Sequence, residues 1–388
     1  PIGLLSHAPG SYPILQMSRR KPHNKKSTRP AMDLKTWRAP PMPEDMLQAA
    51  SCDASDSKRA RDILSEWGFC IVKGVAKPSE VEKAKEHFMS WIRKAGINCK
   101  SGDWKSIDGA KWESLGFPRT GVLTRYSIGQ SDLLWHCRTL EGVQQVFQNI
   151  WGTEDLVTSF DGAGAARNPF FASEAGRREW CTQGGWFHLD QNAKLMPGFD
   201  LWQGLLNLFP ASANSGSTIV VPKSHIEKFP KIFQDSHRRD WKRRTHFVQL
   251  DKSGDFERYC KDAVQVVLGA GDMFLWDSRT IHCSQGVNTL LCDQSELAKA
   301  SEIDRKLFHP DNPFVRLVTY ICMVPRKRIN EESKKARTKA VLMGTTYPHH
   351  PVIGEQHLTI PARKDKDSNN TKFSYRPPEP SSKIWKLV

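Results

Sequence analysis

Two ionisable residues, His188 and Asp190, stand two positions apart in the apolar and aromatic stretch "GGWFHLDQN". In an extended chain successive side chains point to opposite faces, so His188 and Asp190 would share a face while Leu189 points away. An imidazole and a carboxylate that project together into a cavity are a pair that can bind a metal ion. A surface strand with a polar outer face would show the same alternation, so the pair alone leaves both interpretations open.

A third candidate ligand, His282, stands far downstream in "GAGDMFLWDSRTIHCSQGVN", after a predicted strand that begins at the turn "GAGD". Two imidazoles and one carboxylate on one side of a metal ion suit non-haem Fe(II), because the opposite positions stay open for O₂ and a chelating cosubstrate. His188, Asp190 and His282 are therefore candidate metal ligands. Catalytic zinc uses the same kind of ligand set, so a zinc hydrolase is an alternative at this point.

The elements that must position these residues change in character along the chain. Near the start of the predicted structure, "ILSEW" predicts a helix that ends at Gly68, "FCIVKGV" a strand, and "KPSEVEKAKEHFMSWIRKAG" an amphipathic helix. From about residue 120 onward the pattern predicts short strands: "DLVTSF", "WFHLD", "LWQGLLNLF", "STIVV", "HFVQL", "VQVVL", "DMFLWD" and "FVRLVTYICMV". Helices followed by about eight short strands predict a mainly β fold with flanking helices (α+β), as in a sandwich or jelly roll.

Composition divides the chain into three predicted parts. Residues 1–56 are rich in Pro, Lys and Ser without a sustained period, which predicts a basic, flexible arm. Residues 57–348 form a single predicted domain, in which 289–313 interrupts the last two strands as an insertion. Residues 349–388 predict a basic and largely extended tail, and His349 and His350 at its start are predicted to lie on the surface.

The net charge of +15 lies mostly in the flanks. Residues 1–60 hold ten Lys and Arg against five Asp and Glu, and residues 326–388 hold fourteen against six, which leaves +2 for 61–325. Solvated tails explain this distribution better than a nucleic-acid surface on the folded part. Nucleic acid is therefore not an expected partner.

Other bulk properties indicate a soluble intracellular protein. The apolar fraction of 38% is that of a folded chain, and no run approaches the ~20 apolar residues of a membrane span. The nine Cys include no CxxC pair, which argues against a disulfide framework and a structural zinc site. We expect a cytoplasmic location, although the acid-free basic segment before Asp33 is also compatible with an organelle or nuclear signal.

Four stretches, in order, resemble the phytanoyl-CoA dioxygenase (PhyH) family of Fe(II)- and 2-oxoglutarate-dependent oxygenases. They are an opening helix–strand–helix, a His-x-Asp metal motif, an Asn-Gly turn with a Pro-x-Ser-His strand end, and a Gly-Asp strand with a distal His: "ILSEWGFCIVKGVAKPSEVEKA", "WFHLDQ", "ANSGSTIVVPKSH" and "LGAGDMFLWDSRTIHCSQGVN". The resemblance covers roughly residues 60–325. It implies a double-stranded β-helix, a cupin-like jelly roll, in agreement with the strand pattern.

The resemblance also implies a cosubstrate site. In the family an Arg on a strand after the distal His binds the far carboxylate of 2-oxoglutarate, aided by a hydroxyl two residues after that His. Ser284 stands at the hydroxyl position, and Arg316 is the basic residue of "FVRLVTYICMV". Arg279 is the competing candidate. Asn207, in "LLNLF", either faces the cosubstrate or is a satisfied core residue, and His225, in "PKSH", is expected to be structural.

The implied function is that of an oxidoreductase, an Fe(II)- and 2-oxoglutarate-dependent dioxygenase that uses O₂. Hydroxylation of a C–H bond in a small organic or lipid-like substrate, with release of succinate and CO₂, is the expected reaction. The alternative is a catalytically inactive jelly-roll binding module recruited through the basic tails. The sequence specifies neither the substrate nor the oligomeric state.

Overall fold

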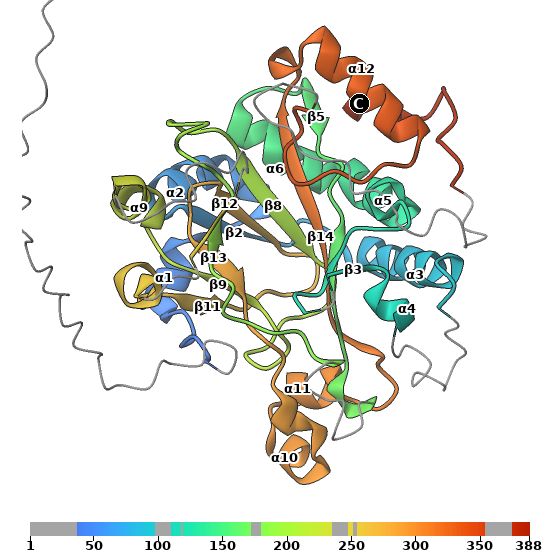
Figure 1. Ribbon diagram of the computed structural model, residues 1–388. Helices are drawn as coiled ribbons and strands as arrows, with labels where there is room; N and C mark the ends of the chain where they lie inside the picture. Colours follow the sequence, from blue (N-terminus) through green and yellow to red (C-terminus); the bar gives the residue numbers. More distant parts are fainter. Residues whose placement is uncertain are drawn as a thin grey trace, which may run out of the picture. The chain divides into compact units, whose positions relative to one another are not determined.

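Two β-sheets and a layer of helices make up the folded part of the chain in the computed structural model (Figure 1). The structure describes residues 37–97, 110–117, 119–171, 180–234, 247–250, 254–353 and 375–388. All of them belong to one compact unit, Leu34–Val388. The predicted double-stranded β-helix with flanking helices is confirmed.

The larger sheet has nine strands, and its central members are long and buried. In spatial order they are β1 (Ser51–Asp53), β2 (Phe69–Lys73), β12 (Met273–Asp277), β8 (Trp202–Asn207), β14 (Phe314–Pro325), β6 (Ala163–Arg167), β4 (Val122–Leu123) and β3 (Gly116–Phe117), with β5 (Leu156–Thr158) also paired to β14. β14 lies between β8 and β6, and all pairs except β1–β2 are antiparallel.

The smaller sheet carries the predicted His-x-Asp motif and the distal His. Its order is β10 (Val248–Gln249), β7 (His188–Leu189), β13 (His282–Ser284), β9 (Thr218–Val220) and β11 (Val264–Val266). Strands far apart in the sequence therefore lie side by side, as a jelly roll requires. All eight stretches predicted as strands contain a strand of one of the two sheets.

Helices cover the outer face of the larger sheet. α2 contacts β2 and β12, and both α5 and α6 contact β14. The helices are α1 (Glu44–Ala49), α2 (Ala60–Trp67), α3 (Pro78–Lys94), α4 (Ala110–Glu113), α5 (Asp132–Thr139), α6 (Glu141–Trp151), α8 (Ser224–Glu227), α9 (Phe229–Gln234), α10 (Gln294–Lys299), α11 (Glu302–Leu307) and α12 (Glu331–Leu342). None of the helices in the described residues is long and apolar enough to cross a membrane.

Local sequence explains where the first helices begin and end. α2 ends at Gly68, whose φ of +80° is a left-handed conformation that glycine adopts without strain. A Cβ at that position would also lie 2.5 Å from Nδ1 of His225. α3 begins with Pro78 in its first turn, and the Glu80 carboxylate accepts a hydrogen bond from the backbone N–H of Lys77 at 2.7 Å.

Several elements differ from the sequence-based expectation. α5 and α6 occupy residues predicted as strand-rich, because Val143, Val146 and Ile150 form an apolar helical stripe against the sheet. The insertion 289–313 holds α10 and α11. α1 and β1 lie within the predicted arm, since β1 pairs with β2 at the sheet edge, and a 3₁₀ turn, Lys383–Leu387, lies within the predicted tail. The domain boundaries stay a prediction, and most of the arm lies outside the described residues.

Candidate metal centre

The register of the smaller sheet brings the two candidate histidine ligands together. His188 of β7 lies directly opposite His282 of β13, and such pairs in antiparallel strands point to the same face. Their ring centroids are 4.3 Å apart. Asp190 follows at the bend after β7, with its carboxylate oxygens 3.5 Å from Nε2 of His188 and 3.3 Å from Nε2 of His282. One ligand atom from each of these three residues lies within 4.8 Å of the others.

Backbone carbonyls orient both imidazoles. Nδ1 of His188 lies 3.1 Å from the carbonyl oxygen of Trp186, and Nδ1 of His282 lies 2.9 Å from that of Thr280. A carbonyl oxygen can only accept a hydrogen bond, so each Nδ1 carries the hydrogen and each Nε2 keeps its lone pair. The two Nε2 atoms face Asp190. This is the arrangement in which imidazoles bind a metal and are steered by groups behind them.

Electrostatics favour the deprotonated ligands that a metal needs. Burial lowers the pKa of His188 to about 4, and the neighbouring His282 adds to the shift. Burial opposes ionisation of the Asp190 carboxyl, but His349, His188 and His282 outweigh it and hold the pKa of Asp190 well below its usual range. A neutral imidazole beside a carboxylate is ready to accept a divalent cation.

Arg316 reaches from the larger sheet to the smaller one. It is 7% exposed, and its guanidinium donates to Oγ of Ser284 and to Oγ1 of Thr218, both at 3.3 Å. Ser284 and Thr218 lie opposite each other in the β13–β9 pair, two residues along from His282, so both hydroxyls face the same side as the histidines. A register shift in the β14–β6 pair between Phe314 and Arg316 re-aims the strand at this point.

Arg316 and Arg279 differ in what occupies their guanidinium groups. Arg279 donates to both carboxylate oxygens of Asp277, at 2.8 and 2.6 Å. In the described part of the chain no carboxylate forms an ion pair with Arg316, whose two side-chain partners are neutral hydroxyls. Burial lowers the pKa of Arg316, but an arginine stays charged. Arg316 is therefore a buried cation in a position to receive an anionic ligand.

Comparison with known proteins identifies the family of this chain. Residues 64–290, which hold all three candidate ligands, match the sequence profile of the phytanoyl-CoA dioxygenase family. The chain belongs to this family. It is consequently an oxidoreductase of the Fe(II)- and 2-oxoglutarate-dependent class that uses O₂, and the His188–Asp190–His282 set fits Fe(II).

This member of the phytanoyl-CoA dioxygenase family is similar to a fungal protein in sequence and to several solved structures in fold. It is 26% identical over 309 residues to "Ava biosynthesis cluster protein O" of Aspergillus versicolor, a match that covers 76% of this chain and 88% of the relative. Among solved structures, iron-bound EctD from S. alaskensis is 13% identical, with a TM-score of 0.42 and coverage of 78% and 85% of the two chains. The carbocyclase SnoK from nogalamycin biosynthesis is 12% identical, with a TM-score of 0.41 and coverage of 72% and 84%.

Two other residues singled out in the sequence of this family member contact backbone rather than the three ligands. Asn207 is buried, and its amide nitrogen donates to the carbonyl oxygens of Phe209, Leu268 and Gly269, so it closes a turn at the end of β8. Nε2 of His225 lies 3.1 Å from the carbonyl oxygen of Ser65, beneath the end of α2. The structure does not bring either side chain into the metal-ligand set.

Thr218 and Trp276 lie near the centre and escaped the sequence analysis, whereas Trp186 flanks the His-x-Asp motif in the sequence and could line a pocket or pack in the core. Thr218 shares Arg316 with Ser284, and the only signal was its place in the strand "STIVV". Trp186 stacks on His188 at 4.7 Å between centroids, and Trp276 lies 5.1 Å from His282. The buried indole nitrogens of both tryptophans have no hydrogen-bond partner among the described residues.

His349 and His350 are not the surface residues that the sequence predicted. His350 is 1% exposed and pairs with Asp200, with Nε2 2.9 Å from a carboxylate oxygen. The His349 side chain is 14% exposed, and its Nδ1 lies 3.9 Å from Oδ1 of Asp190. No local sequence pattern identifies these contacts, because they depend on how the chain returns after α12.

Proposed function

We propose that this protein hydroxylates a C–H bond of a small organic substrate at a centre formed by His188, Asp190 and His282. Arg316 and Ser284 anchor the cosubstrate 2-oxoglutarate. The observation that carries the proposal is Arg316, a buried cation without a carboxylate partner in the described residues, on the same side of the smaller sheet as the ligand set. A guanidinium fork pairs well with a carboxylate, and Ser284 and Thr218 hold the fork in place.

The residues of the chain would act by binding and orientation. Iron, when bound, supplies the O₂ chemistry that oxidises 2-oxoglutarate to succinate and CO₂ and the substrate to its hydroxylated product. His188, Asp190 and His282 would hold Fe(II), and a set of three protein ligands would leave positions free for the cosubstrate and O₂. Arg316 fixes the far end of 2-oxoglutarate, which leaves its 2-oxo acid end directed to the metal. The ligand side chains are 9–12% exposed, so little water would reach them.

Two unpartnered N–H groups beside the ligand histidines indicate the kind of molecule that fits there. Trp186 and Trp276 flank the ligand histidines, and each presents a buried N–H without an acceptor in the described residues. Buried donors of this kind are costly unless a partner arrives, so oxygen acceptors of a bound ligand fit there. The name of the Aspergillus versicolor relative refers to a biosynthesis cluster, which supports a small organic compound as the substrate.

Succinate release from 2-oxoglutarate tests this function before the substrate is known. The protein is incubated with Fe(II), ascorbate, O₂ and 2-oxoglutarate, and succinate is measured for the wild type, Asp190→Ala and Asp311→Ala. Asp311 is a surface carboxylate with a 90% exposed side chain, so it is the matched control. We expect slow succinate release from the wild type and the control and none from Asp190→Ala. Equal release from all three, or failure of the wild type to bind either Fe(II) or 2-oxoglutarate, would reject the proposal and favour the binding-module alternative.

A further inference from the structure

A segment outside the family match lies against the candidate metal centre. The family match ends at residue 290. Residues 345–353 follow α12 and pass close to the ligands, so that Nδ1 of His349 lies 3.9 Å from Oδ1 of Asp190. The other carboxylate oxygen, Oδ2, is the one nearest His282. His349 therefore approaches the metal-ligand carboxylate from a part of the chain that lies beyond the residues matched to the family.

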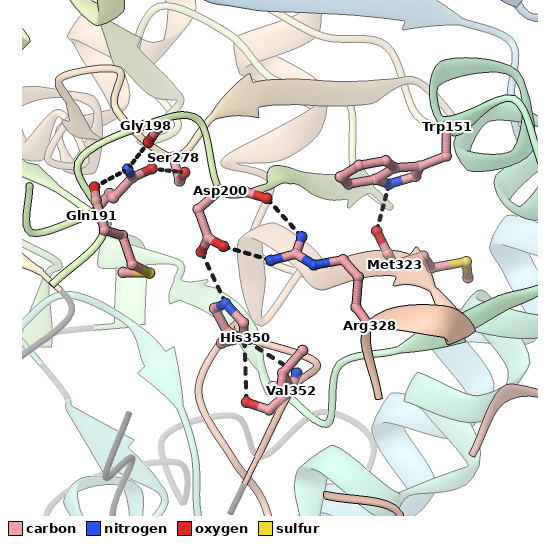
Figure 2. Close-up of polar contacts among 10 residues, drawn as sticks. Trp151, Gln191, Gly198, Asp200, Ser278, Met323, Arg328, His350 and Val352 are labelled. Atoms are coloured by element: carbon pink, nitrogen blue, oxygen red, sulfur yellow. Dashed lines mark hydrogen bonds and ion pairs between the residues drawn. The ribbon is translucent and has the colours of Figure 1, made fainter. Parts of the chain in front are cut away.

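A buried cluster fixes the residue next to His349. The carboxylate of Asp200 contacts Nε2 of His350 at 2.9 Å and Nη2 of Arg328 at 2.6 Å, and Nη1 of Arg328 donates to the carbonyl oxygen of Asp200 at 2.7 Å (Figure 2). The Asp200 side chain is 9% exposed. A carboxylate bound on both oxygens by two different groups has little freedom, so His350 is held at one place.

Hydrogen bonds of Gln191 close the loop that follows Asp190. Gln191 donates to the carbonyl oxygen of Met196 at 2.7 Å. It also donates to the carbonyl oxygen of Gly198, and Ser278 donates to the side-chain oxygen of Gln191 at 2.6 Å (Figure 2). This loop leads from the metal ligand Asp190 to Asp200, which holds His350. Two sets of contacts therefore bear on the position of the Asp190 carboxylate: those of Gln191 within the loop, and that of His349 from the segment after α12.

Additional bonds hold the returning segment at both of its ends. The hydroxyl of Thr346 accepts from the backbone N–H of Gly129 at 3.0 Å, and the N–H of Tyr347 donates to the carbonyl oxygen of Phe160 at 3.0 Å. Beyond His350, Arg337 donates to the carbonyl oxygen of Pro351 at 2.5 Å. His349 therefore sits in the middle of a segment whose backbone is tied to the domain on either side.

We propose that His349 is a positioning residue for the metal centre and that the Asp200–Arg328–His350 cluster keeps it in place. The inference rests on the proposed function. A carboxylate that binds a metal through one oxygen leaves the other to be oriented by a neighbouring donor, and loss of such a donor costs about 10–100-fold in metal affinity. The distance of 3.9 Å is within ion-pair range and longer than a hydrogen bond. Contacts at metal-free or ligand-free sites are commonly loose and tighten on binding.

Fe(II) affinity, measured by anaerobic calorimetry without turnover, tests the role of His349. The variants are His349→Ala, His349→Asn and the control His309→Ala, whose side chain is 57% exposed. Asparagine keeps an N–H donor close to the position of Nδ1. We expect His349→Ala to bind Fe(II) about 10–100-fold more weakly, and His349→Asn and the control to remain within about threefold of the wild type.

The outcomes separate this inference from the proposed function. A wild type that takes up no Fe(II) overturns both. A wild type that binds Fe(II), together with a His349→Ala variant that binds equally well, overturns only the role of His349. Thermal unfolding of each variant checks that it is folded. If the alanine variant loses stability, His349→Leu takes its place, because leucine fills similar space without a donor and should show the same loss of Fe(II) affinity; wild-type affinity in His349→Leu overturns the role of His349.

A double-mutant cycle tests the role of the cluster. Arg328→Met removes one of the two groups that hold Asp200. Within the described residues, Arg328 forms no hydrogen bond or ion pair with His188 or Asp190. We expect Arg328→Met to weaken Fe(II) binding by a few-fold in the wild-type background and to have no further effect in His349→Ala. Equal effects in both backgrounds would show that the cluster does not act through His349 and would overturn that part of the inference.

Discussion

Replacing Arg316 by methionine should weaken cosubstrate binding strongly without destabilising the ligand-free protein. The guanidinium is buried, and its side-chain partners are two neutral hydroxyls at 3.3 Å. Loss of these two bonds costs about 1 kcal/mol each. Desolvation of an ion in a protein interior costs several kcal/mol, and methionine removes that penalty while filling similar space. We therefore expect a Tm at or above that of the wild type.

The effect on 2-oxoglutarate affinity has the opposite sign. Truncating one partner of a buried, hydrogen-bonded charge pair costs about 2–5 kcal/mol, which is roughly 30- to 4,000-fold in Kd at 1.4 kcal/mol per tenfold. Arg316→Lys keeps the charge and loses the planar fork, so we expect an intermediate affinity. Anaerobic calorimetry with Fe(II) present measures Kd, and scanning fluorimetry of the ligand-free protein measures Tm.

Arg279→Met is the control that can refute this reasoning. Its guanidinium already serves the buried carboxylate of Asp277, so its loss should lower Tm and leave the Kd for 2-oxoglutarate close to that of the wild type. The two arginine variants should thus show opposite patterns of stability and binding. If Arg279→Met loses 2-oxoglutarate and Arg316→Met retains it, Arg279 is the cosubstrate anchor.

Three further predictions concern the metal, acid pH and a tryptophan. Removing Fe(II) with a chelator should lower the Tm of the wild type, because a metal at 100 times its Kd adds about 2.7 kcal/mol, and Asp190→Ala should show no such change in scanning fluorimetry. Burial raises the pKa of Asp200, but the hydrogen bond from His350 and the charge of Arg328 outweigh it and hold that pKa below its usual value. The contribution of Asp200 to stability is therefore complete above the unfolded pKa of about 3.9 and is lost as the pH falls below that value. Between about pH 5 and about pH 3, the free energy of unfolding measured in urea should therefore decrease less for Asp200→Asn than for the wild type. Trp276→Phe removes an N–H without a partner in the described residues, so it should cost under about 1.5 kcal/mol in urea unfolding while weakening the binding of oxygen-bearing ligands in calorimetry.

Short apolar runs between turn signals made the larger part of the fold predictable. Stretches such as "STIVV" and "DMFLWD" have the buried, β-branched or aromatic character of central strands, and each contains a strand. β6 escaped prediction because its sequence, Ala163–Arg167, is rich in Ala and Gly. A Cβ on Gly164 would lie 2.7 Å from the hydroxyl of Tyr320 and 3.0 Å from the Val318 side chain, so a larger residue there would force these side chains of the neighbouring strand to move. Tertiary packing overrides strand propensity at this position.

The metal-ligand set follows from short-range rules that a sequence displays, whereas its surroundings do not. His188 and Asp190 are two positions apart, and a single antiparallel register places His282 beside them. His349 reaches the same carboxylate only because Asp200, Arg328 and His350 come together from three separate segments. None of these contacts has a periodic signal, since each depends on the path of a loop. The positions of the ligands thus follow from strand pairing, which a sequence can indicate. The orientation of the Asp190 carboxylate depends on the contact with His349, which only the folded chain shows.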